Sequence, residues 1–170
     1  MKIKRILICS VVGIVVVTFI RMIWFFYRVV ENRIAFAERY RAYYELVNQW
    51  MSNKNKNHSL VNFLREKNIN KVAVYGNGSL GKLLIHDLQA ENMEIVCIVD
   101  KGAKEIKTGN QIPIVPLKNT SILSKADILI VTPIADYADV LEDLHENDIQ
   151  MEIVSLEDVI YENDYSFEDI

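Results

Sequence analysis

Three glycines in close succession mark the point where an apolar run gives way to a helical pattern. The stretch "VAVYGNGSLGKLLIHDLQ", residues 72–89, contains Gly76, Gly78 and Gly81 in a G-x-G-x-x-G arrangement. The apolar residues before the first glycine predict a buried strand, and the leucines after the last glycine predict a helix with one buried face. A strand that turns through glycine straight into a helix is typical of the first unit of a parallel α/β sheet.

Strand-like and helix-like segments alternate along the chain after residue 70. Fully apolar strands separated by helices are typical of a parallel sheet that is covered on both faces. We therefore predict an α/β fold, a Rossmann-like parallel sheet of about five strands, in a domain at residues 59–161 that is followed by an acidic tail at 162–170. The predicted strands are residues 71–75, 94–99, 112–115, 128–131 and 152–154, and the helical patterns are residues 80–88, 134–144 and 156–161.

The N-terminal segment is strongly apolar. Residues 6–20 carry no charge, and the apolar character continues past Arg21 as far as Tyr27. At about 1.5 Å of rise per residue this stretch reaches roughly 33 Å, which is enough to cross a bilayer. We predict a transmembrane anchor at residues 1–30. A cleaved signal peptide is the alternative, prompted by the sequence Ala-Phe-Ala at residues 35–37, but such peptides are cleaved soon after the apolar stretch.

Residues 31–58 are predicted to form an amphipathic juxtamembrane helix and a polar linker, the linker at residues 52–58. The helix either packs on the globular domain or continues as a stalk, which is the common use of an amphipathic face, or it serves self-association or docking to a membrane partner. Its apolar positions at helical spacing are Tyr40, Tyr43, Tyr44, Val47, Trp50 and Met51.

Charge is distributed unevenly along the chain. All 19 Lys and Arg residues lie within residues 1–125, whereas the last 45 residues carry 14 Asp and Glu and no basic residue. Such an acidic surface repels phosphate backbones, so we expect no binding to nucleic acid. The positive-inside rule leans weakly towards a globular domain on the cytoplasmic side. The two cysteines and three histidines show no disulfide or metal-ligand pattern, so we expect no metal.

The glycine turn has the residues that a nucleotide site needs. Gly76 permits the tight turn, Gly78 lets a diphosphate approach the backbone, and Gly81 lets the helix pack against the strand. Asp100 ends the next predicted strand, 24 residues after Gly76, where a carboxylate could accept hydrogen bonds from a ribose. We predict that this turn binds a nucleotide. The alternative is a purely structural turn without a ligand.

Three further residues are candidates at the same edge of the sheet. Thr132 and Pro133 follow the fourth predicted strand, and they either line the ligand site or cap the next helix, with Pro133 at its first position. Lys101 could meet a phosphate, although a lysine here is more often a solvated surface residue. We identify no catalytic residue, because the chain contains neither a Tyr-x-x-x-Lys pair nor a G-x-S-x-G elbow, and it leaves no room for a substrate domain.

Residues 71–161 resemble a known group of domains. The motifs "VAVYGNGSLGKLL", "VCIVDK", "ADILIVTP" and "EIVSLEDVIYE" resemble the small Rossmann-type nucleotide-binding domains of bacterial surface-polysaccharide proteins. The upstream sequence is similar to uncharacterised membrane-anchored proteins of capsule or exopolysaccharide gene clusters. The resemblance implies a phosphate loop formed by Gly76, Asn77, Gly78, Ser79, Leu80 and Gly81, with Asp100 as the ribose contact.

This resemblance implies a single-pass membrane protein that binds NAD(P) or a nucleotide-sugar at the cytoplasmic face and assists surface-polysaccharide assembly beside other membrane proteins. It supplies no activity of its own. Two alternatives stay open: a non-catalytic interaction scaffold with a structural glycine turn, and a nucleotide-sensing regulator of a membrane transporter.

Overall fold

The computed structural model describes residues 2–103, 112–118 and 120–165; the side chains of residues 2–12, 14, 120 and 165 lie outside that description. The chain divides into two compact units, Met1–Ala42 and Tyr43–Ile170. One helix, α1 (Lys2–Asn55), supplies the described part of the first unit and the beginning of the second.

The first unit exposes large apolar side chains at successive positions of α1. Phe19, Trp24 and Phe25 are each more than half exposed. Within the described residues, however, we find no stretch of helix that is both long enough and apolar enough to cross a membrane. The predicted transmembrane helix is therefore not found among these residues. The rest of the predicted span lies outside the described side chains.

The second unit is built on a five-stranded sheet in which every pair of neighbouring strands is parallel. The strand order is β3-β2-β1-β4-β5, which places β1 at the centre and matches the first five strands of doubly wound α/β sheets. The predicted α/β class and the parallel sheet are thus confirmed. The strands are β1 (Lys71–Tyr75), β2 (Glu94–Val99), β3 (Ile114–Val115), β4 (Ile128–Val131) and β5 (Glu152–Ser155).

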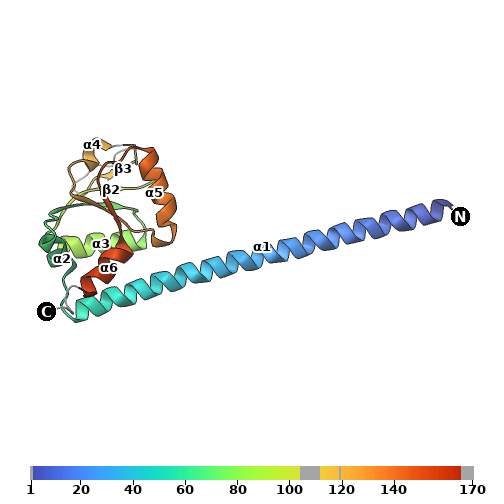
Figure 1. Ribbon diagram of the computed structural model, residues 1–170, viewed down its shortest axis with the longest axis horizontal. Helices are drawn as coiled ribbons and strands as arrows, with labels where there is room; N and C mark the ends of the chain where they lie inside the picture. Colours follow the sequence, from blue (N-terminus) through green and yellow to red (C-terminus); the bar gives the residue numbers. More distant parts are fainter. Residues whose placement is uncertain (1, 104–111, 119, 166–170) are drawn as a thin grey trace. The chain divides into compact units, whose positions relative to one another are not determined.

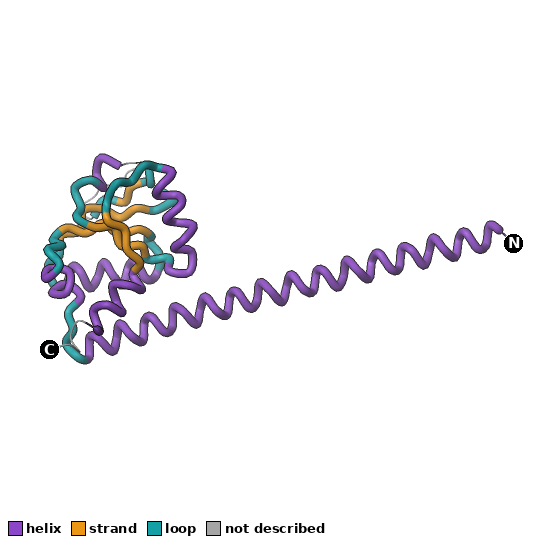
Figure 2. The backbone as a smooth tube through the Cα atoms, viewed as in Figure 1, coloured by secondary structure: helices purple, strands orange, loops and turns teal. Residues whose placement is uncertain are grey.

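Helices cover both faces of this sheet (Figure 1). On one face α4 (Thr120–Leu123) and α5 (Tyr137–Glu146) pack on alternate strand residues such as Cys97 and Leu129. On the other face lie α2 (Leu60–Glu66), α3 (Ser79–Ala90) and α6 (Leu156–Tyr165). The strands therefore form a central layer between helices, as the tube in Figure 2 shows. The predicted tail at 162–170 is helical as far as Tyr165 and then lies outside the described residues.

The last turns of α1 belong to the core of the second unit. Leu46 is 1% exposed and Trp50 is 5% exposed. Asn53 is also buried, and its side-chain amide donates to the Ile160 carbonyl over 2.8 Å. The helix therefore continues to Asn55, through the first half of the predicted linker. The predicted apolar stripe divides, because Trp50 faces the core whereas Tyr40, Tyr44 and Met51 stay exposed.

Four helices of this unit end in the same way. An Asn or Asp in the left-handed conformation follows each of α1, α2, α3 and α5, and short polar side chains tolerate this conformation better than most. After α2 the Ile69 amide donates back to the Leu64 carbonyl over 2.9 Å, and after α3 the Met93 amide does the same to Leu88. These caps turn the chain so that the next apolar residue enters the core. The four residues are Asn57, Asn68, Asn92 and Asp148.

Replacing Leu46 by alanine should lower the free energy of unfolding by about 3 kcal/mol, because a buried leucine loses its contacts and leaves a cavity. The matched control is Leu83→Ala, since Leu83 is 49% exposed on α3 and its loss should cost less than about 0.5 kcal/mol. Urea denaturation followed by circular dichroism measures both. Equal losses would contradict the placement of Leu46 in the core.

Candidate functional site

The glycine loop connects β1 to α3 at the carboxyl end of the central strand. Gly76 has a φ of +99°, which L side chains rarely adopt, and its amide donates to the Val99 carbonyl of β2 over 2.8 Å. A Cβ atom added at Gly76 would lie 2.7 Å from Thr132 Oγ1 and 3.3 Å from Pro133 Cδ. Both the backbone conformation and the available space therefore require glycine at this position.

Gly81 is required by packing. A Cβ atom at this position, in the first turn of α3, would lie 2.0 Å from the Gly76 carbonyl oxygen and 3.1 Å from its carbon. These are backbone atoms, so a side chain could be accommodated only by displacing the helix from the end of β1. The third glycine is thus a structural residue, as the sequence predicts.

Gly78 differs from the other two glycines. It is the N-cap residue of α3, and its φ of −77° and ψ of −166° are extended values that any residue adopts. Apart from Gly78 itself and its two neighbours in the chain, no residue has a heavy atom within 4 Å of the place where its Cβ would be. Neither conformation nor packing explains a glycine here. The space lies at the start of α3, where the amides of Ser79, Leu80 and Gly81 have no carbonyl one turn earlier in the helix to bond to; the first such bond runs from the Lys82 amide to the Gly78 carbonyl over 3.0 Å.

Asp100 holds the loop against the end of β2. Its Oδ2 accepts from the Asn77 amide over 3.0 Å, and its Oδ1 accepts from the Gly102 amide over 2.8 Å. The structure therefore brings Asp100 to the glycine loop, as predicted. A carboxylate has about four lone-pair positions, so these two bonds leave acceptor capacity for a further donor.

Lys101 is held by a partner on the neighbouring helix. Its Nζ lies 2.6 Å from Asp143 Oδ2 on α5, and this hydrogen bond together with the charge of Asp143 raises the pKa of Lys101. Sequence reasoning missed Tyr75, the last residue of β1. Burial, followed by the charge of Asp143, raises the pKa of its phenol, although Lys101 acts in the opposite direction. The sequence feature that could have pointed to Tyr75 is its position directly before Gly76.

Thr132 braces the loop from β4. It is buried, and both its amide and its hydroxyl donate to the Tyr75 carbonyl, over 3.0 Å and 2.9 Å. The short helix η1 (Ile134–Asp136) follows, as the alternative of helix capping predicts, but its N-cap residue is Pro133 and not Thr132, and no side chain caps it. Pro133 forms the centre of an inverse γ-turn, with φ −74° and ψ 73°, in which the Ile134 amide donates to the Thr132 carbonyl.

Cys97 is an unsuitable nucleophile. It is fully buried in β2, and burial raises the pKa of its thiol to about 11, so the thiol stays protonated at neutral pH. Within the part of the chain that the structure describes, no group of three or more His, Cys, Asp or Glu side chains is placed to hold a metal ion.

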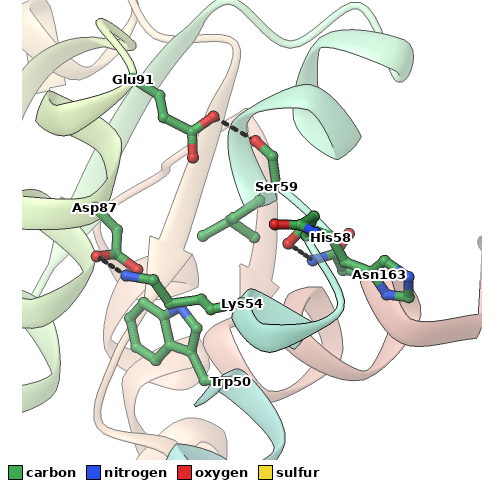
Figure 3. A pocket seen from close by; sticks show the side chains of 9 residues that line it. Trp50, Lys54, His58, Ser59, Asp87, Glu91 and Asn163 are labelled. Carbon is green, nitrogen blue, oxygen red and sulfur yellow. Dashed lines mark hydrogen bonds and ion pairs between the residues drawn. The ribbon is translucent and has the colours of Figure 1, made fainter. Parts of the chain in front are cut away.

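Two cavities lie away from the glycine loop. One, of about 630 Å³, is next to Lys71 and Glu94, at the amino ends of β1 and β2, whereas the glycine loop lies at the carboxyl ends. The other, of about 230 Å³, lies beside Trp50, between the end of α1, α3 and α6 (Figure 3). Its charged side chains already have partners within the protein. Lys54 pairs with Asp87 over 2.7 Å, and Glu91 accepts a hydrogen bond from the Ser59 hydroxyl. We therefore favour the glycine loop, whose amides point to a definite ligand chemistry.

The fold and the site together define an α/β protein with a glycine loop at the carboxyl end of its central parallel strand. The model of the family described as C2185-like, N-terminal, matches residues 68–155, which is more than half of the chain. The chain belongs to this family. The matched region begins just before β1 and ends with β5, so it contains the whole sheet and the glycine loop. Among curated proteins, none matches the sequence.

The same change from glycine to serine, made at Gly81 and at Gly78, distinguishes a glycine that packing requires from one that packing does not require. Gly81→Ser should lower the free energy of unfolding by at least about 2 kcal/mol, because its Cβ would collide with the Gly76 carbonyl. Gly78→Ser should stay within about 0.5 kcal/mol of the original chain, because serine suits an N-cap and has space there. Urea denaturation of both variants tests this. A destabilised Gly78→Ser would show that Gly78 is also structural.

Proposed function

We propose that this protein is a Rossmann-like nucleotide-binding module whose glycine loop holds the phosphates of NAD(P) or a nucleotide-sugar. The observation that carries the proposal is Gly78. The fold requires glycine at positions 76 and 81, whereas at Gly78 it leaves open space beside the backbone, through which a ligand could approach the amides closely. In a strand-turn-helix unit, a diphosphate is the group that uses such an approach.

Backbone groups supply most of the proposed phosphate binding. The amides of the first turn of α3 and the positive end of its dipole, equivalent to roughly half a charge, favour an anion beside Gly78. We do not assign this role to Lys101, because Asp143 already offsets its charge. Asp100 is the proposed ribose contact, and its bond to the Asn77 amide keeps the carboxylate next to the loop. We assign no catalytic residue.

We further propose that the N-terminal helix attaches this module to a membrane, with the globular domain on the cytoplasmic side, where such ligands are made. The support is the run of exposed apolar side chains on α1 and an Arg28 guanidinium 4.2 Å from the centre of the Trp24 ring. Aromatic and basic residues of this kind gather at membrane interfaces. A role in surface-polysaccharide assembly rests on the resemblance of the sequence motifs.

The nucleotide proposal is tested by thermal unfolding of the full chain with NAD, NADP or a UDP-sugar. At a concentration 100-fold above the dissociation constant, a ligand that binds only the folded state adds about 2.7 kcal/mol, or roughly 5 °C or more in melting temperature. Gly78→Val should fold normally and lose this shift, because its side chain fills the space beside the amides.

The matched control for that experiment is Leu83→Val, which introduces the same side chain at an exposed position further along α3. It should keep the shift. If Gly78→Val responds to the nucleotide as strongly as Leu83→Val does, the ligand does not lie on the glycine loop.

Membrane attachment is tested by cell fractionation. The full chain should sediment with membranes and stay there during an alkaline carbonate wash, because apolar insertion, unlike ionic contact, resists high pH and salt. A chain without residues 1–30 should move to the soluble fraction. Release of the full chain by carbonate would instead indicate a peripheral, polar attachment.

A second candidate function is a non-catalytic interaction scaffold, and the bonds around the loop favour it. The side chains of the predicted site already bond within the protein. Asp100 binds the Asn77 and Gly102 amides, Lys101 binds Asp143, and Thr132 binds the Tyr75 carbonyl. A wild-type chain that shows no thermal shift with any nucleotide would favour this function.

A further inference from the structure

Helix α1 carries a second stripe, of mostly apolar residues, which we name the heptad stripe. Neighbouring residues of the stripe are separated alternately by three and by four positions in the sequence, which is the spacing of the contact line in a coiled coil. Every one of them is exposed, including Ile34 at 53% and Tyr44 at 69%. The heptad stripe consists of Ile20, Ile23, Tyr27, Val30, Ile34, Ala37, Arg41, Tyr44, Asn48 and Met51.

Within the second unit, the residues of the heptad stripe lie opposite the face of α1 that packs into the core. Successive residues are about 100° apart around a helix, so residues two positions apart point in nearly opposite directions. Leu46 is buried in the core, and Tyr44 and Asn48 lie two residues to either side of it and are exposed. Packing of the end of α1 into the core therefore leaves Tyr44 and Asn48 accessible to another molecule.

The charges beside the stripe fit a second copy of the same helix. If Ile34 and Ala37 occupy the two core positions of a heptad, Arg33 and Glu38 occupy the flanking positions. In a parallel in-register pair these flanking positions of consecutive heptads face each other, so Arg33 of one copy meets Glu38 of the other, and symmetry forms the pair twice. A polar core position such as Asn48 costs stability and specifies the register of a dimer.

We propose that two copies of this chain associate in parallel through the heptad stripe of α1. The stripe repeats every 3.5 residues on average, which matches the left-handed winding of two identical helices. The flanking pair of Arg33 and Glu38 is self-complementary, which points to a second copy as the occupant. The glycine loop takes no part in this contact, so the proposal stands independently of nucleotide binding.

Disulfide trapping in the full chain tests the arrangement, with Cys9 replaced by serine. Ala37→Cys places thiols at equivalent core positions, where the two Cα atoms approach within the roughly 4.4–6.8 Å that a disulfide needs. Arg39→Cys, on the opposite side of the same turn, is the matched control. We expect mild oxidation to trap the Ala37→Cys dimer at least tenfold faster. Equal trapping of the two variants, or trapping of neither, would overturn the proposal.

Charge reversal gives an independent readout by sedimentation equilibrium. Arg33→Glu should raise the dimer dissociation constant about fivefold or more, because two attractive pairs become repulsive. The double change Arg33→Glu with Glu38→Arg restores opposite charges in reversed order and should return the constant to within about twofold of the original. A double variant as weak as the single one, or an original chain that is monomeric at micromolar concentration, would overturn the parallel pairing.

Discussion

The contact between the first turn of α3 and the end of β1 is the constraint on which the site depends. Only hydrogen atoms at Gly81 allow the helix to lie so close to the Gly76 carbonyl. That closeness fixes where α3 begins and which way its first amides point. Thr132 keeps the same strand end in place from β4 by binding the Tyr75 carbonyl. The turn is thus over-determined by packing before any ligand arrives.

A site made from backbone has consequences for what it can recognise. Amides at a helix start favour phosphate of many kinds, because every nucleotide presents the same charged oxygens. Discrimination among nucleotides must come from side chains further along the ligand. The side chains next to the loop already bond to other parts of the protein: Asp100 accepts from the Asn77 amide, and Lys101 binds Asp143. The role that we propose for the loop is therefore limited to holding a ligand.

The sheet could be predicted from the sequence because each strand is a short apolar run bounded by polar or turn residues. The ends of β1, β2 and β4 coincide with the predicted ones, and β3 is shorter because pairing with β2 begins only at Ile114. The three loop glycines and a separate role for each could be predicted from the motif, but the atoms that crowd Gly76 and Gly81 could not. Whether a glycine is crowded or open depends on contacts such as Thr132, 56 residues away from Gly76.

Long-range partners explain the other differences. The pairing of Lys101 with Asp143 joins residues 42 positions apart, and no local pattern reports it. Likewise, Leu46 and Trp50 lie in a helix that looks like a continuation of the anchor, and only their packing shows that the globular unit begins before the predicted linker. Periodicity identified an apolar stripe on this helix but could not divide it between two faces.

The two edge strands of the sheet restrict how copies of this chain can meet. One edge strand, β3, has only two residues and follows Pro113, which has no amide hydrogen to offer a neighbouring strand. The other, β5, is four residues long and begins with an exposed glutamate, Glu152. Short, charged or proline-flanked edges are poor templates for added strands. The sheet is therefore protected against growing from one molecule into the next, and assembly is left to helical surfaces.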